Sequence, residues 1–243
     1  MKELKQKSIM RRALALARSR KVLHVLIACE ESQAECIAFR ELGHEAFSCD
    51  IQPCRKGMHP EWHIQADVTP LLKGGVQFVT QDGLKHRVPS WDLIVAHPPC
   101  TYLCKVGSVH LIRHTPEGTF INKDRWQKMI EAAAFFRQCL RARAPYVAVE
   151  NPIPMRRAGL PKPSFYACPS WFGVKYTKKT LYWVKNLPPL VATIDYPGAK
   201  QFVRASRGKY RSRTFPEMAK ALADQWSEFI LNEINHETNS TAR

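Results

Sequence analysis

Cys100 and Glu150 are the side chains whose surroundings best suit covalent chemistry. Cys100 follows two prolines after the apolar run WDLIVA (91–96), and prolines restrict the backbone that would hold its sulfur. Its thiolate would be the nucleophile, and cationic groups nearby would lower its pKa. Glu150 ends a predicted strand over 145–150. A thiolate adds more readily to C6 of a pyrimidine when an acid hydrogen-bonds at N3, so the pair favours addition chemistry on a pyrimidine.

Two carboxylates follow the second and third predicted strands. Asp50 lies near the end of HEAFSCDI (44–51), and Asp67 lies near the end of WHIQADV (62–68). An acidic residue after the second strand can accept hydrogen bonds from ribose hydroxyls, and one after the third can accept from an adenine amino group. Their occurrence at successive strand ends predicts a cofactor that carries a nucleoside.

The elements that must position these residues alternate between apolar strands and helices. VLHVLIAC (22–29) predicts the first strand, after which Ser32 is expected to cap a helix that ends at Gly43. The runs at 91–96 and 145–150 supply the fourth and fifth strands. Strands that are apolar on both faces and separated by helices indicate an α/β fold, with a mostly parallel sheet and helices on both faces.

Apolar periodicity and turn residues predict the other segments. Asp82-Gly83 lies between two short β-like runs and predicts a type I′ turn in an inserted hairpin over 74–90. The segments after the fourth strand are a polar loop at 101–122, a helix at 123–142, a proline-rich loop at 151–170, a final strand pair from GVKY and TLYWV, a basic loop at 185–210 and a closing helix at 215–234. We expect one domain over 22–236 and a tail at 237–243.

The chain of 243 residues has 37 Lys and Arg against 21 Asp and Glu, a formal net charge of +16. Such a charge predicts a polyanionic partner, and nucleic acid and an anionic membrane surface both fit it. The basic residues from Lys200 to Arg213 are interleaved with Phe202 and Tyr210, which suits phosphate contacts and base stacking, although a solvated face is the commoner role. A basic helix at 1–21 could be solvated, contact phosphates or anchor at a membrane.

The eight cysteines lack the spacing of a disulfide framework, and several lie within apolar runs. No run approaches the roughly 18 apolar residues of a membrane span, and the N-terminus lacks the pattern of a secretory leader, so we expect a cytoplasmic location without membrane association. We expect no metal, because neither possible ligand set has paired CxxC spacing. These sets are Cys100, Cys104, His97 and His110, and Cys49, Cys54, His59 and His63.

In order, the segments VLIACEES, Asp50, ADV, PPC and ENP resemble the cytosine-C5 DNA methyltransferases. The spelling ACEESQ, HPPCTYL and ENP is similar to the small methylases of phages and prophages, over about residues 22–230. This resemblance implies a Rossmann-like class I methyltransferase fold. It also implies methyl transfer from S-adenosylmethionine to C5 of cytosine in DNA, through a covalent Cys100 adduct with the ring activated by Glu150.

The resemblance assigns roles to further residues. It implies that RTFPEMAKALADQW (213–226) is the terminal helix whose start completes the cofactor pocket, and that Pro99 and Asn151 shape the site. It implies that TKKT (177–180) contacts the target nucleotide. The residues implied to bind the cofactor are Cys29, Glu30, Asp50, Ile51, Asp67 and Pro99, and those implied to bind substrate are Asn151, Lys178 and Lys179.

Two departures from the family leave other functions open. CEESQ (29–33) stands where the family has a glycine-rich loop, and about thirty residues stand where it inserts a target-recognition domain. One alternative is an amino-group DNA methyltransferase, since HPPCTY (97–102) loosely echoes an Asp/Asn-Pro-Pro-aromatic turn, with Cys100 at the aromatic position. The other alternative is a non-catalytic DNA-binding protein. We expect a monomer.

Overall fold

The computed structural model describes residues 21–194, 198–201 and 214–241. Nearly all of the predicted basic helix at 1–21, and most of the basic segment that ends at Arg213, lie outside the described residues. Within the described ranges, no helix is long and apolar enough to cross a membrane.

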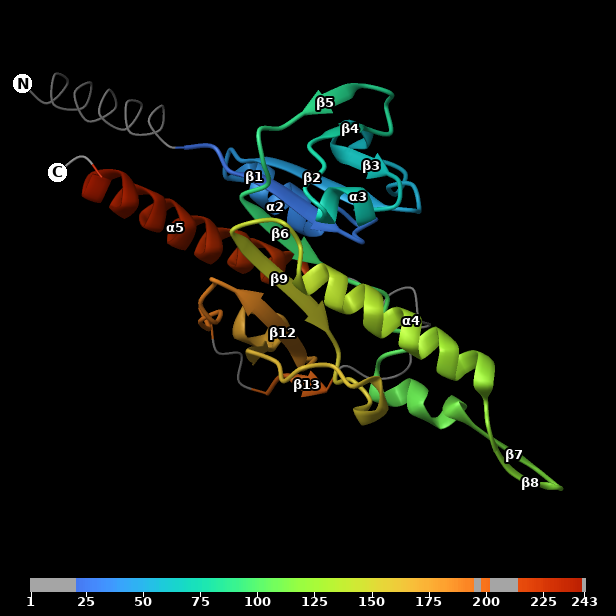
Figure 1. The fold of residues 1–243 in the computed structure, drawn as a ribbon. Helices are drawn as coiled ribbons and strands as arrows, with labels where there is room; N and C mark the ends of the chain where they lie inside the picture. Colours follow the sequence, from blue (N-terminus) through green and yellow to red (C-terminus); the bar gives the residue numbers. More distant parts are fainter. Residues whose placement is uncertain (1–20, 195–197, 202–213, 242–243) are drawn as a thin grey trace, which may run out of the picture.

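A seven-stranded sheet forms the centre of the molecule, with the strand order β10-β12-β9-β6-β1-β2-β3 (Figure 1). The five strands from β9 to β3 are parallel, whereas β12 runs antiparallel to β9 and β10. The strand bounds are β1 His24–Ala28, β2 Glu45–Asp50, β3 His63–Gln65, β6 Leu93–Ala96, β9 Tyr146–Asn151, β10 Phe165–Ala167 and β12 Thr180–Lys185. The predicted α/β class with a mostly parallel sheet is confirmed.

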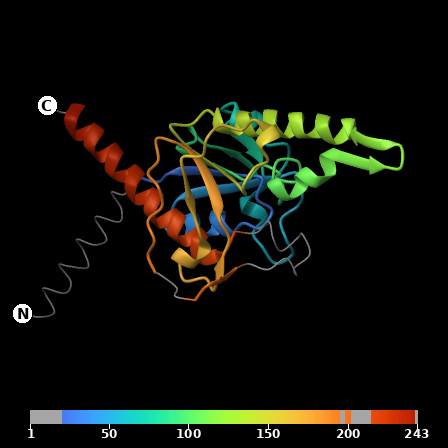
Figure 2. The ribbon, with the colours of Figure 1, turned by 90° about the horizontal axis from the view of Figure 1, so that it is seen from below.

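Helices cover both faces of this sheet (Figures 1 and 2). Alternate residues of β1 point to opposite sides, so Val25 and Ile27 pack in the core beneath α2 and α5, while Leu26 packs in the core beneath α3 and α4. Trp226 and Phe136 are fully buried in these two cores. The helices are α2 Ala34–Glu41, α3 Thr69–Leu72, α4 Lys123–Leu140 and α5 Pro216–Thr241. Helix α5 is longer than the predicted 215–234 and runs through most of the predicted tail.

The smaller elements lie outside the central sheet. They are the 3-10 turns η1 Pro60–Trp62, η2 Lys105–Leu111, η3 Arg156–Ala158 and η4 Pro169–Trp171, and the strands β4 Gln77–Val79, β5 Lys85–Arg87, β7 Ile112–Thr115, β8 Gly118–Ile121, β11 Tyr176–Thr177 and β13 Lys200–Gln201. Strands β4 and β5 pair antiparallel within the segment predicted as an inserted hairpin. Its turn is not type I′, because Asp82 does not have the positive φ that this turn requires and the pairing leaves five residues between the strands.

The predicted final strand pair was wrong. GVKY contributes β11, which pairs with β13 in a separate small sheet, whereas TLYWV forms β12 within the central sheet. The partners of β12 are β9 and β10, and β10 lies in the segment that was predicted to be loop. That segment has five prolines in twenty residues, and its strand of three residues is too short to show a periodic pattern.

The segment 101–122 is also not a simple polar loop. It forms η2 and the antiparallel β7–β8 hairpin, which projects from the body beside the start of α4 (Figures 1 and 2). The side chains of β8 are exposed on both faces, as are most of those of β7, so these strands show no alternation of apolar and polar residues. We call residues 105–122 the arm.

Candidate active site at the carboxyl edge of the sheet

The carboxyl ends of the parallel strands meet along one edge of the sheet, which is where ligands bind in open α/β folds. The last paired residues of β1, β6 and β9 are aligned. The residues that follow these pairs, Cys29, His97 and Glu150, are therefore neighbours along this edge. Asp50 ends β2 at the same edge, and Asp67 follows β3.

His97 lies between two carboxylates. Its Nε2 is 3.0 Å from Oε2 of Glu35, and its Nδ1 is 3.4 Å from Oε2 of Glu150. Glu35, in the first turn of α2, is fully buried. The sequence patterns did not predict this pairing, since they indicated His97 only as a possible metal ligand. The position of His97 directly before PPC was the one available clue.

The charges of this cluster follow from its geometry. A neutral imidazole has one N–H, so only an imidazolium can donate to both carboxylates. Burial alone would lower the pKa of His97, but the Glu35 carboxylate and the hydrogen bonds to both acids raise that pKa well above its ordinary value. Burial would raise the pKa of Glu150, yet the His97 hydrogen bond and the positive charge of Lys178 lower it overall. Near neutral pH, Glu150 is therefore ionised beside a charged His97.

Cys100 lies next to a second thiol. The backbone N–H groups of Leu103 and Cys104 both donate to the carbonyl of Cys100, at 3.0 and 2.9 Å, which brings Cys104 back toward it. A hydrogen bond from Cys100 lowers the pKa of Cys104 to about 6, and the backbone N–H of Gly107 contributes. The same bond, burial and the Glu150 charge raise the pKa of Cys100. The positive charge of Lys178 lowers the pKa of Cys100, but not enough to offset these effects. The prediction that nearby cationic groups would lower the pKa of Cys100 overall was therefore wrong.

The loop after β1 takes its shape without glycine. Cys29 and Gln33 both adopt a positive φ, of 62° and 56°, in the region that usually favours glycine. Ser32 does not cap α2, because the Glu30 carboxylate accepts the N–H groups of Glu35 at 2.8 Å and Cys36 at 3.3 Å instead. Burial and the Glu35 charge raise the pKa of Glu30 to about 8, so this carboxyl carries a proton at neutral pH.

The other predicted cofactor residues are more accessible. Asp50 and Asp67 each use Oδ1 to accept a backbone N–H two residues later, from Gln52 and Thr69. Ile51 is 74% exposed, an unusual state for so apolar a side chain. Pro99 is exposed as well, whereas Pro98 behind it is buried. Apolar surface and carboxylate oxygens thus lie together at this edge.

Of the three predicted substrate residues, Asn151 and Lys178 lie next to Glu150. Strand β12 begins at this edge because it runs antiparallel to β9, and this places Lys178 close enough to Glu150 to lower its pKa. Lys179 points elsewhere, with its Nζ 4.2 Å from the centre of the Tyr166 ring. Asn151 is fully buried, and its amide has no hydrogen-bond partner among the described residues. A narrow cavity of about 20 Å³ lies here, lined by Glu150, Pro169, Lys178, Thr180, Tyr182, Thr214, Phe215 and Met218.

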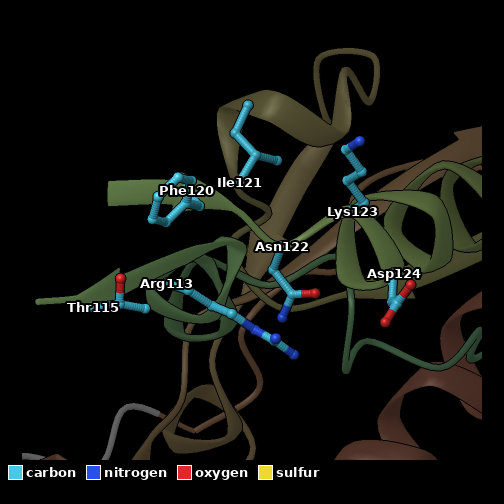
Figure 3. Close-up of a pocket in the computed structure, with 7 residues that line it drawn as sticks. All are labelled: Arg113, Thr115, Phe120, Ile121, Asn122, Lys123 and Asp124. Carbon is cyan, nitrogen blue, oxygen red and sulfur yellow. The ribbon is translucent and has the colours of Figure 1, made fainter. Parts of the chain in front are cut away.

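The arm adds a basic, hollowed surface after Cys100. One hollow of about 350 Å³ lies where the hairpin meets α4, and the side chain of Arg113 reaches toward Asn122 there (Figure 3). A neighbouring hollow of about 430 Å³ is lined by Tyr102, His110, Arg113, Asn122, Asp124, Arg125 and Lys128. The cationic groups of Arg125 and Lys128 lie 5.0 and 5.7 Å from the centre of the Tyr102 ring. This surface therefore combines positive charge with an aromatic ring.

Comparison with known proteins does not assign the chain to a family. No family model matches the chain, and no curated protein is significantly similar to it. The fold and the edge geometry define an α/β protein with a Rossmann-like sheet and a cluster of acidic, thiol and imidazole groups at the carboxyl edge. Among the described residues, no group of three or more His, Cys, Asp or Glu side chains could hold a metal ion.

Proposed function

We propose that this protein transfers a methyl group from S-adenosylmethionine to C5 of cytosine in DNA. The observation that carries the proposal is the placement of Cys100 and Glu150 after the adjacent parallel strands β6 and β9, close enough for the Glu150 charge to raise the pKa of the Cys100 thiol. The mostly parallel sheet with helices on both faces agrees with the Rossmann-like fold that the resemblance implies.

Four side chains, those of Cys100, Glu150, Cys104 and Lys178, have separate roles in the proposed reaction. Cys100 Sγ adds to C6 of the cytosine and breaks the C5–C6 double bond. At the same time N3 of the cytosine receives a proton through the Glu150 carboxyl. As the Sγ–C6 bond forms, the Cys100 proton passes to the Cys104 thiolate, which already accepts a hydrogen bond from the Cys100 thiol. Lys178 keeps positive charge beside Glu150. After C5 is alkylated, its proton is lost to water, the C6–Sγ bond breaks to restore the double bond, and Sγ takes its proton back from Cys104.

Five of the six predicted cofactor residues fit S-adenosylmethionine. Asp50 and Asp67 each have a second carboxylate oxygen besides the Oδ1 that holds the local turn, and Ile51 and Pro99 offer exposed apolar surface. The backbone of Cys29 lies at the end of β1. The Glu30 carboxylate is instead engaged by α2. The cofactor, when bound, supplies the electrophilic methyl group.

The basic surface supports DNA as the partner. The target base must leave the duplex to reach Cys100, so the backbone on either side has to be held meanwhile. The arm and the start of α4 place Arg113 and Lys123 on the segment that follows the catalytic loop, in a chain whose net charge is +16. These residues would contact phosphates rather than read sequence.

Mass spectrometry of nucleosides from DNA of cells that express the protein tests the proposal. 5-Methylcytosine above the level in cells with an empty vector would support it. N4-Methylcytosine or N6-methyladenine would instead favour the amino-group reaction suggested by the HPPCTY turn. DNA binding without any modification would favour a binding protein.

Replacing Asp67 should weaken cofactor binding. We expect Asp67→Ala to raise the Kd for S-adenosylmethionine about tenfold in calorimetry, because the substitution removes one charge-assisted hydrogen bond. Asp67→Asn should raise this Kd by a similar factor while keeping the local turn, because its amide oxygen still accepts the Thr69 N–H but its NH2 group cannot accept from the adenine amino group. Asp224→Ala, in the exposed Lys220–Asp224 pair on α5, is the matched control. Failure of the intact protein to bind at high cofactor concentration would reject the site.

DNA affinity should fall steeply with salt and depend on the arm. Phosphate contacts release counterions, so Arg113→Ala with Lys123→Ala should reduce the slope of log K against log salt by about one for each phosphate that is no longer neutralised. Lys85→Ala, on the hairpin of β4 and β5, is a matched control. Fluorescence anisotropy with a labelled duplex from low to physiological salt measures both quantities. A slope unchanged by the double substitution would exclude these phosphate contacts.

A further inference from the structure

We propose that His97 is the positioning residue that stores the proton which Glu150 delivers to N3 of cytosine, and that buried Glu35 keeps this proton on the imidazole. This inference deepens the proposed function and rests on it. His97 itself does not reach the base in our proposal, because it acts through Glu150.

The geometry gives His97 two acceptors and therefore two protons. Oε2 of Glu35 lies 3.0 Å from Nε2, and Oε2 of Glu150 lies 3.4 Å from Nδ1. The side chain of His97 is 13% exposed and that of Glu35 is not exposed at all, so little water can replace either bond. A doubly protonated ring is the only form that satisfies both carboxylates.

The charge of Glu35 is balanced by His97. A fully buried carboxylate is costly unless it is paired, and the other oxygen of Glu35, Oε1, has no hydrogen-bond partner among the described residues. Oε2 forms an ion pair with the His97 ring. The pair therefore stabilises a positive imidazolium in a place where burial alone would favour a neutral ring.

The other titratable groups around the cluster agree with this assignment. Glu30 faces both Glu35 and His97 but is held in its protonated form by burial and by the Glu35 charge, which raise its pKa to about 8. Burial and the charges of Glu35 and Glu150 raise the pKa of Tyr182, so its hydroxyl stays neutral. The positive charge of Lys178 lowers the pKa of Glu150, and the charge of Glu150 in turn raises the pKa of Cys100.

The proton balance of the addition step requires such a donor. Glu150 has a lowered pKa and is ionised, so near neutral pH it has no proton of its own to give. As Cys100 Sγ bonds to C6, N3 takes a proton through the Glu150 carboxyl, and the Nδ1 proton of His97 replaces it. His97 is then neutral while retaining its Nε2–H to Glu35. When Sγ leaves, the proton returns to Nδ1 by the same route.

Two measurements that need no cofactor test the proposal. Nitrogen-15 NMR of the His97 ring reports its protonation as the pH is raised from mildly acidic to alkaline. Exchange at C5 reports addition alone, because a C6 adduct can take deuterium from D₂O at C5 before it eliminates. Carbon-bound deuterium survives return to H₂O and adds one mass unit to the cytosine. Methylation with cofactor is the third readout.

We expect an imidazolium at neutral pH in the intact protein, and C5 exchange that declines as pH rises through the raised pKa of His97. Glu35→Gln should move both the ring titration and this alkaline decline to lower pH. His97→Gln should slow exchange and methylation about 10²-fold and abolish the alkaline decline. His24→Gln is the matched control, since His24 lies 3.2 and 3.4 Å from Glu45 and Asp92 at the start of β1, at the other end of the sheet.

Each result decides one proposal. A neutral His97 ring at neutral pH, or an alkaline decline that stays in place in Glu35→Gln and His97→Gln, would overturn the storage role even if methylation is found. If the intact protein neither exchanges C5 hydrogen nor methylates DNA, the proposed function fails, and proton delivery fails with it. The NMR titration would in that case still measure the His97–Glu35 pairing by itself.

Discussion

Cys100→Ser is expected to abolish methylation and covalent trapping while leaving DNA affinity within about twofold. DNA with 5-fluorocytosine at the target should trap the intact protein, because fluorine at C5 cannot leave as a proton. The adduct should survive denaturation and appear as a shifted band on a gel. Serine lacks the nucleophilicity of the thiol but nearly matches its size, and Cys100 is only partly buried, so the fold should persist. We expect kcat to fall by at least about 10³-fold.

Two other cysteines serve as controls for this substitution. The Cys104→Ser protein should still be trapped, but more slowly. Its serine hydroxyl does not ionise near neutral pH, so the thiolate that accepts the Cys100 proton is lost. Cys54→Ser, in the loop after β2, should behave like the unchanged protein. If peptide mapping of the trapped complex found Cys104, or if Cys100→Ser still methylated C5, the nucleophile would be misassigned.

Glu150→Gln should reduce kcat by about 10²- to 10³-fold with little change in DNA affinity. The amide can still hydrogen-bond to the base, but it cannot pass a proton to N3, and this is the step that assists addition at C6. C5 exchange and trapping should slow together with methylation. Single-turnover kinetics on a duplex substrate would separate this slower chemistry from any change in binding.

The effect of Glu150→Gln must be distinguished from removal of a buried charge. Its ion pair with His97 also ends, so the titration of the His97 ring in nitrogen-15 NMR should move to lower pH, because one of the two acids that raise the His97 pKa is gone. Glu233→Gln, on the exposed side of α5, should change neither rate nor pH profile. A Glu150→Gln protein with full kcat would remove Glu150 from the reaction.

Local sequence patterns were enough to predict the strands that carry the site. The runs at 22–29, 91–96 and 145–150 are mostly apolar on both faces, and such runs fold as buried parallel strands whose carboxyl ends must share an edge. Both cores of the sheet bear this out, since alternate residues of β1 are buried on opposite sides. The position of Cys100 and Glu150 on neighbouring strands followed from that rule.

Patterns without periodicity gave wrong or incomplete predictions. The arm is exposed on most sides and β10 lies among prolines, so neither shows the alternation from which strands are recognised. The cap of α2 comes from Glu30 rather than Ser32, because Gln33 takes a left-handed conformation and the chain turns before the helix begins. A cap of this kind depends on where the whole loop is placed.

The residue types, the strand ends and the chemistry that a thiol and a carboxyl could share were predictable from the chain alone. The charge states of these groups depend on the fold. His97 and Glu35 are far apart in the chain, and the packing of α2 against the sheet brings them together. Likewise the turn after Pro99 brings Cys104 to Cys100. The pKa of a buried group depends on burial and on the charges within a few ångströms, which only the folded chain defines.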